Sequence, residues 1–226
     1  MTRSYAVIDD FLEPDDHLAL WEAFQRTGIA PTGSSEWNRA YRLMDGEQPA
    51  NSQSRLRNPR LQDGTEDASP TPPTLRLFSD TLLKTVTRES PPIALPPWTG
   101  FSQSAWIYRR DMGLEWHSDT GWLAGYIYYA HPAWRASWGG ELLVAAADHP
   151  AESRPGETRS AVEAVCRSGG AFIYPRPNRL VLLLGGTMHC IKKVESAAGS
   201  ALRASVSGFF FNTEPTPSGI GRRRNP

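Results

Sequence analysis

The C-terminal half of the chain is a succession of short apolar segments, and this pattern constrains the fold more than any other feature. The segments are rich in β-branched and aromatic residues, and clusters of Gly, Pro, Asp or Ser separate them. They are residues 105–108, 124–130, 141–146, 171–174, 180–184 and 202–211. Short apolar segments between turn residues are typical of strands. The chain from Phe101 onward is therefore predicted to form a β-sandwich or β-barrel.

The N-terminal part predicts one strand and two helices that pack on a face of this β structure. Residues 5–8 form a short β-type segment. Pro14 and the two acidic residues after it suit the first turn of a helix, which we expect to end at Gly28. Apolar residues recur at helical spacing over residues 75–86, and the prolines at 91 and 92 end that second helix.

Residues 45–74 contain few apolar side chains among many Pro, Ser, Asn, Gln, Asp and Arg. We expect a long mobile loop here, of the kind that acts as a lid or a binding loop. Arg55, Arg57 and Arg60 in this loop would be available to an anion.

The length of 226 residues suits a single domain that spans residues 1–226. Within it we expect residues 1–100 to be a helix-rich support and residues 101–211 to be the β core. Residues 213–226 would form a solvated tail.

The composition limits the classes of function. The 24 Lys and Arg residues balance the 24 Asp and Glu residues, whereas a nucleic-acid binder usually carries excess positive charge. No apolar segment approaches the roughly 18 residues of a membrane span, and residues 1–10 lack the pattern of a secretory signal. Two cysteines are too few for a disulfide framework. We therefore expect a cytoplasmic protein without a nucleic-acid or membrane partner.

His117 is followed two residues later by Asp119. Residues i and i+2 of an extended segment face the same side, so the imidazole and the carboxylate can converge on one metal ion. His189 follows the apolar segment 180–184 and a glycine-containing turn. Two histidines and one carboxylate form the facial triad of non-haem Fe(II) oxygenases. The same ligands also suit zinc with a bound water, so the triad alone leaves the reaction open.

The other three histidines have no clear ligand partner in the sequence. His17 lies near the polar side of the first predicted helix, and we expect it at the surface. His131 and His149 each precede a proline in a loop, and we interpret both as structural residues.

Arg203 lies in a segment where alternation places Arg203, Ser205 and Ser207 on one face. Burial of an arginine on such a strand is costly without an anionic partner. Its guanidinium matches a carboxylate with two parallel hydrogen bonds, and Ser205 can add a hydroxyl. A dicarboxylate that chelates iron at one end needs such an anchor at its other end. The alternative is a surface arginine paired with an acid such as Glu195.

Four short motifs occur in a fixed order, namely His117-x-Asp119, Gly139-Gly140-Glu141-Leu142, His189-x-Ile191-x-x-Val194 and Arg203-x-Ser205. This set resembles the Fe(II)/2-oxoglutarate dioxygenases, and most closely their prolyl 4-hydroxylase-like branch. The resemblance covers about residues 101–211, and residues 8–12 resemble the same branch more loosely.

The resemblance implies a mainly β fold with supporting α-helices, the double-stranded β-helix or jelly roll. It also implies that His117, Asp119 and His189 bind Fe(II). Arg203 would hold the distal carboxylate of the cosubstrate 2-oxoglutarate, with Ser205 as a helper.

Two tyrosines are further cosubstrate-binding candidates by resemblance. Residues 127–129, Ile-Tyr-Tyr, resemble a strand of the oxygen-sensing prolyl hydroxylases whose second tyrosine contacts the distal carboxylate. Tyr129 is that residue here. Tyr108 matches a family tyrosine that precedes the His-x-Asp motif and would line the pocket. For both tyrosines, packing in the core is the alternative interpretation.

Three departures from relatives bear on the reaction. Nucleobase demethylases of this superfamily carry a second arginine six residues beyond the first, where this chain has Phe209, which argues against nucleobase repair. Halogenating relatives replace the carboxylate ligand with a small residue, so Asp119 argues for oxygen transfer. Arg203 follows His189 by 14 residues, more than in the oxygen-sensing enzymes, which implies a larger turn at residues 196–200.

The resemblance thus implies an enzyme that hydroxylates an unactivated C–H bond with O₂ and converts 2-oxoglutarate to succinate and CO₂. A chain without an added peptide-binding module favours a small-molecule substrate, an amino acid or a natural-product intermediate. A peptidyl, prolyl-type side chain is the alternative. Aromatic candidates to border the substrate pocket are Trp37, Trp116, Trp122, Tyr126 and Trp138, and for each of them packing in the core is the alternative interpretation.

Two other classes of function stay open on the sequence. A non-catalytic jelly-roll binding module could keep a vestigial metal site, although the complete set of ligands and Arg203 argues against decay. A zinc hydrolase would need a carboxylate base near the metal, for which Glu115 and Glu141 are poor candidates, and it leaves Arg203 unexplained.

Overall fold

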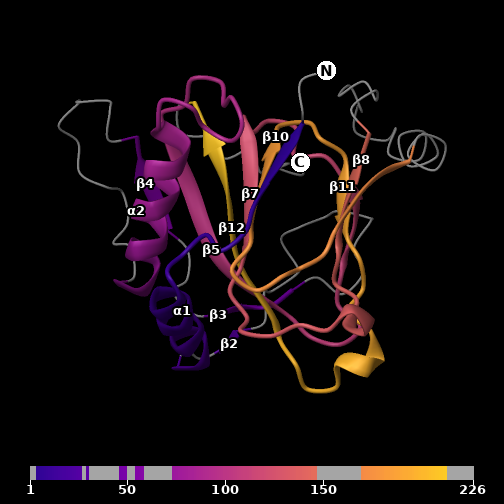
Figure 1. Cartoon of the computed structure of the whole chain (residues 1–226). Helices are drawn as coiled ribbons and strands as arrows, with labels where there is room; N and C mark the ends of the chain where they lie inside the picture. The colour runs from indigo at the N-terminus through magenta and orange to yellow at the C-terminus, as the bar shows by residue number, and fades with distance from the viewer. Residues whose placement is uncertain are drawn as a thin grey trace, which may run out of the picture.

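The computed structural model describes residues 4–26, 29–30, 46–49, 54–58, 73–146 and 169–212, which form two facing sheets with two helices (Figure 1). The helices are α1 (Pro14–Arg26) and α2 (Pro73–Thr87). The strands are β1 (Tyr5–Ile8), β2 (Ile29–Ala30), β3 (Gln48–Pro49), β4 (Ser54–Arg57), β5 (Gly100–Tyr108), β6 (Leu114–His117), β7 (Ala124–Tyr129), β8 (Leu142–Ala145), β9 (Gly170–Ile173), β10 (Leu180–Leu184), β11 (His189–Ile191) and β12 (Arg203–Phe211). Two short 3-10 helices are η2 (Ala136–Trp138) and η3 (Ser196–Ala198). Neither α-helix is long and apolar enough to cross a membrane, as far as the described ranges extend.

The larger sheet has the strand order β1-β10-β7-β12-β5-β4, and the smaller sheet has the order β6-β11-β8-β9. Every pairing between these strands is antiparallel. Strands distant in sequence are neighbours, because β12 lies between β7 and β5 and β1 pairs with β10. The mainly β jelly roll expected from the sequence is confirmed by this arrangement.

The larger sheet buries apolar side chains on both faces because alternate residues of each strand point in opposite directions. Tyr126 and Tyr128 of β7 pack with Phe78 and Leu82 of α2 in the layer between the sheet and the helices. Tyr129 belongs to the layer between the two sheets. Figure 1 shows α1 and α2 on the side of the larger sheet that faces away from the smaller one. We call the opposite face, which carries Tyr129, the inner face.

Helix α1 begins at Pro14 and carries Asp15 and Asp16 in its first turn, as the sequence predicts. The expectation of a surface position for His17 is wrong, since its side chain is buried against the larger sheet. His17 Nδ1 lies 2.6 Å from the Tyr128 hydroxyl, which donates to Asn178 Oδ1 at 3.0 Å. Burial lowers the pKa of His17. The burial of His17 depends on the docking of α1 on the sheet, which the sequence of the helix does not reveal.

The prediction of one long loop over residues 45–74 is wrong for residues 54–57, which form strand β4. Strand β4 pairs with β5 and forms the edge of the larger sheet. Gln103 fixes this edge through hydrogen bonds, because its Nε2 donates to Ser54 Oγ at 2.7 Å and its Oε1 accepts from Ser79 Oγ at 2.9 Å. An edge strand with one buried face needs few apolar residues, so β4 has a weak sequence signal. Most of residues 45–74, Arg60 included, lies outside the described residues, as do His149 and residues 213–226.

Candidate metal centre and anion site

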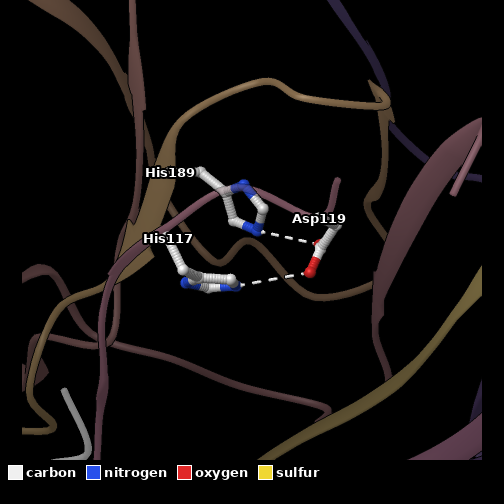
Figure 2. A group of neighbouring side chains, drawn as sticks. All are labelled: His117, Asp119 and His189. Carbon is white, nitrogen blue, oxygen red and sulfur yellow. Dashed lines mark ion pairs between the residues drawn. The ribbon is translucent and has the colours of Figure 1, made fainter. Parts of the chain in front are cut away.

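His117, Asp119 and His189 come together where the smaller sheet meets the loop after β6 (Figure 2). His117 ends β6 and lies opposite His189, the first residue of β11, in the antiparallel pairing of these strands. One potential ligand atom from each of the three residues lies within 4.8 Å of the others. His117 and His189 are buried, and Asp119 is partly exposed. Two neighbouring residues of one segment and a third from a distant strand therefore present their donor atoms to one point.

The two imidazoles have the protonation pattern that a metal ligand needs. His117 Nδ1 lies 2.7 Å from the carbonyl oxygen of Glu115, and His189 Nδ1 lies 2.8 Å from that of Thr187. A carbonyl oxygen only accepts hydrogen bonds, so each Nδ1 carries the proton and each Nε2 keeps its lone pair. These Nε2 atoms point at Asp119, at 3.8 Å for His117 and 3.5 Å for His189 (Figure 2). The donor set fits a divalent transition metal.

Arg203 is a fully buried cation on the inner face of β12. Its guanidinium carbon lies 5.0 Å from the ring centroid of Tyr108 and 5.0 Å from that of Tyr129. Its Nε donates to the carbonyl oxygen of Gly140 at 2.8 Å. Nη1, Nη2 and the Tyr129 hydroxyl are also buried, and none of them has a hydrogen-bond partner among the described residues.

Buried unpaired donors of this kind are rare, because each costs about 1–3 kcal/mol or more when charged. Arg203 and Tyr129 together therefore form a site for an anion that accepts several hydrogen bonds, such as a carboxylate. Burial raises the pKa of Tyr129, and the nearby positive charge of Arg203 opposes this effect. The hydroxyl is therefore protonated and able to donate. Ser205 is also buried on this face and lies opposite Tyr129 in the strand pairing.

The turn at Gly139 and Gly140 shapes the anion site, and sequence reasoning missed this role. A Cβ on Gly140 would lie 2.7 Å from Cδ of Arg203, and the φ of Gly140 is +74°. Trp134 Nε1 donates to the carbonyl oxygen of Gly139 at 2.9 Å and holds the turn. Only glycine allows the backbone to approach the arginine this closely. The pair of glycines before Glu141 was the available signal.

The aromatic residues expected to border the substrate pocket occupy different places. The prediction for Tyr126 is wrong, because this residue lies on the helix-covered face of the larger sheet. Its hydroxyl donates a hydrogen bond to the Ser102 carbonyl oxygen at 2.9 Å. The prediction for Trp116 is also wrong. This side chain packs against Ala145 and Met188, on the side of the smaller sheet opposite to His117. Adjacent strand residues point to opposite faces, which explains both corrections.

The remaining candidates are Trp37, Trp122 and Trp138. Trp138 packs in η2 with an edge-on contact to Trp134 and belongs to the layer between the sheets. Trp122 is half-buried and stacks on Phe209, with ring centroids 4.9 Å apart and an interplanar angle of 14°. Trp37 lies outside the described residues.

Comparison with known proteins gives structural relatives only. No family model matches the chain, and no curated protein matches it. A prolyl-4-hydroxylase structure from Pseudomonas putida aligns with a TM-score of 0.57 and 14% identity, over 94% of this chain and 95% of that one. A Trichoplax adhaerens prolyl hydroxylase, in complex with a peptide of hypoxia inducible factor, aligns with a TM-score of 0.57 and 15% identity, over 93% and 84% of the two chains.

HygX from Streptomyces hygroscopicus, with nickel and 2-oxoglutarate bound, aligns with a TM-score of 0.52 and 13% identity, over 94% of this chain and 84% of that one. Identities this low show the fold alone. The chain therefore has the jelly-roll fold that these prolyl hydroxylase and HygX structures share.

Proposed function

We propose that the chain is an Fe(II)- and 2-oxoglutarate-dependent oxygenase that hydroxylates an unactivated C–H bond of a small molecule. The observation that carries this proposal is the pairing of two complementary sites. One is the His117, Asp119 and His189 donor set, and the other is the buried pair of unpaired Arg203 nitrogens beside the Tyr129 hydroxyl. A ligand that chelates a metal at one end and presents a carboxylate at the other satisfies both.

Both sites belong to the space between the two sheets. His189 shares its face of β11 with Ile191, because the two are separated by one residue. Ile191 packs in the same apolar layer as Tyr129 and Tyr108, the two residues that flank Arg203. The donor set and the anion site therefore line one interior, on opposite sheets.

Bound Fe(II) with 2-oxoglutarate would supply the oxidative chemistry, in which O₂ decarboxylates the cosubstrate to succinate and CO₂ and hydroxylates the substrate. The residues of the chain would bind the metal and the cosubstrate and orient them. Arg203 would hold the distal carboxylate through Nη1 and Nη2, while the Tyr129 hydroxyl adds a third donor. Their burial excludes water, which strengthens these charged hydrogen bonds. The carbonyls of Glu115 and Thr187 hold the imidazole tautomers whose Nε2 atoms face Asp119 and would bind the metal.

We propose a small-molecule substrate, with a peptidyl, prolyl-type side chain as the alternative. The relatives include examples of both kinds, since one was solved with a peptide and HygX was also solved with hygromycin B. The substrate class is therefore part of the proposal and is tested separately below.

The proposal is tested by anaerobic titration of the protein with Fe(II) and then 2-oxoglutarate, followed in the visible spectrum. We expect a weak charge-transfer band in wild type and none in His189→Ala. Arg203→Met should retain Fe(II) binding but need about 10- to 150-fold more 2-oxoglutarate, which corresponds to the 1.5–3 kcal/mol of charged hydrogen bonds.

Arg176→Met is the matched control, because Arg176 pairs with Asp9 and Asp10 at the exposed surface. It should bind 2-oxoglutarate as wild type does. Absence of the band in wild type would refute the oxygenase proposal and leave a zinc enzyme or a binding module.

A further inference from the structure

The inner face of the larger sheet changes character along β12. Arg203 and Ser205 are buried, whereas Ser207 and Phe209 on the same face are partly exposed. The face therefore becomes accessible toward the C-terminal end of β12. In Figure 1 this end of β12 lies at the top of the larger sheet.

One row of residues crosses this accessible end. The register of β12 and β5 pairs Ser207 with Ser104 and Phe210 with Phe101, which places Phe209 opposite Ser102. The backbone N–H of Phe209 donates to Ser102 Oγ at 3.2 Å. Ser102 in turn lies opposite Arg55 on the edge strand β4. Because directly opposite residues share a face, Arg55, Ser102 and Phe209 all lie on the inner face.

Trp122 connects the row to the loop that carries the proposed metal ligand Asp119. Trp122 stacks on Phe209, and its backbone N–H lies 3.4 Å from the carbonyl oxygen of the ligand Asp119. In the pairing with β7, Phe209 lies opposite Gly125, and a Cβ on this glycine would lie 3.5 Å from Cδ1 of Phe209, so the ring packs over a residue without a side chain. The Trp122–Phe209 pair therefore lies at the accessible end of the inner face and adjoins the loop that carries Asp119.

Arg55 supplies the charge of this row. Its side chain is exposed, and no carboxylate of the described residues forms an ion pair with it. Two strand spacings of about 4.8 Å separate β4 from β12, so the backbone of Arg55 lies about 10 Å from that of Phe209. An arginine side chain spans much of this distance, and Ser102 between them can add a hydroxyl hydrogen bond.

We propose that this row is the substrate subsite, in which the Trp122–Phe209 pair contacts an apolar or aromatic portion of the substrate and Arg55 pairs with a carboxylate. This inference rests on the proposed function and deepens it, because it names the substrate class as a small aromatic or apolar acid. A guanidinium pairs with a carboxylate in bidentate geometry, and an aromatic pair provides a flat apolar surface.

The test measures binding and does not depend on turnover. The protein is loaded with Zn²⁺ and saturating 2-oxoglutarate, and the probes are 3-phenylpropionate and its neutral analogue 3-phenylpropionamide. Saturation-transfer NMR gives the dissociation constant of each probe at low ionic strength. We expect the acid to bind wild type about fivefold more tightly than the amide, as for one solvent-exposed ion pair.

Arg55→Gln should abolish this preference by weakening the acid alone, whereas Phe209→Leu should weaken both probes equally. Arg176→Gln is the control for loss of a surface arginine outside the row and should retain the preference. Equal binding of acid and amide to wild type would overturn the proposal, and so would an Arg55→Gln variant that keeps the preference.

Failure of this inference is distinguishable from failure of the proposed function. The Fe(II) and 2-oxoglutarate absorption band depends on His189 and Arg203, and Arg55→Gln should leave it unchanged. A normal band without a preference for the acid would overturn the subsite alone. Absence of the band in wild type would refute the oxygenase assignment, whatever the probes show.

Discussion

Substitution of Gly140 tests how the backbone positions the buried cation. A Cβ at this residue would lie 2.7 Å from Cδ of Arg203, in a backbone conformation with φ +74°. Gly199 offers a matched control, because its φ is +58° but a Cβ there would meet no atom within 4 Å. Both Gly140→Ala and Gly199→Ala place an alanine at a positive φ, and only the first displaces the arginine.

The expected free-energy changes distinguish backbone strain from displacement of the Arg203 side chain. The left-handed conformation costs an alanine about 1–2 kcal/mol of stability in either variant. In Gly140→Ala the displaced guanidinium also loses charged hydrogen bonds to the cosubstrate, each worth about 1.5–3 kcal/mol. We therefore expect Gly140→Ala to bind 2-oxoglutarate about 10- to 150-fold more weakly than Gly199→Ala does.

The assay is a titration of the Fe(II)-loaded variants with 2-oxoglutarate under anaerobic conditions, beside thermal unfolding of the same samples. Fe(II) affinity should be unchanged in both variants, because the atoms nearest to a Cβ on Gly140 belong to Arg203 and Val194. Equal 2-oxoglutarate affinities for the two alanine variants would refute the positioning role of Gly140. A loss of affinity in Gly199→Ala as large as in Gly140→Ala would refute it too.

Three further predictions concern buried groups that are not themselves candidate metal ligands. Tyr128→Phe removes the partner of His17 Nδ1, so the free energy of unfolding in urea should fall by about 1–3 kcal/mol while 2-oxoglutarate affinity stays unchanged. Burial lowers the pKa of His131 to about 4 from 6.5, against its contacts with two carbonyls. Below pH 6.5 the unfolded chain then binds a proton that the folded chain does not, so stability should fall by up to about 3 kcal/mol as the pH drops to about 4. His131→Gln should flatten this dependence, and an unchanged slope would contradict the assignment. Burial raises the pKa of Cys190 to about 12, so iodoacetamide should label its peptide in denaturant but not in the native protein, as mass spectrometry would show.

The sequence by itself determines the residues that one strand or one helix brings together. The spacing of His117 and Asp119 places two ligands on one side of an extended segment, and alternation along residues 202–207 places Arg203 with Ser205. Both relationships are local, and the structure has them. The proline and acidic residues at the start of α1 are local signals as well, and the helix begins at Pro14 as expected.

Only the tertiary structure decides which face of each strand borders the interior and which distant strands are neighbours. Alternation separates Tyr126 from Tyr129, but docking of the helices determines that Tyr126 lies under α2 and Tyr129 beside Arg203. His17 is buried for the same reason. The approach of the Gly140 carbonyl to Arg203 and the alignment of Arg55 with Phe209 depend on strand register between segments far apart in the chain. Such register is determined by packing of the whole sheet, which no local spacing of residues encodes.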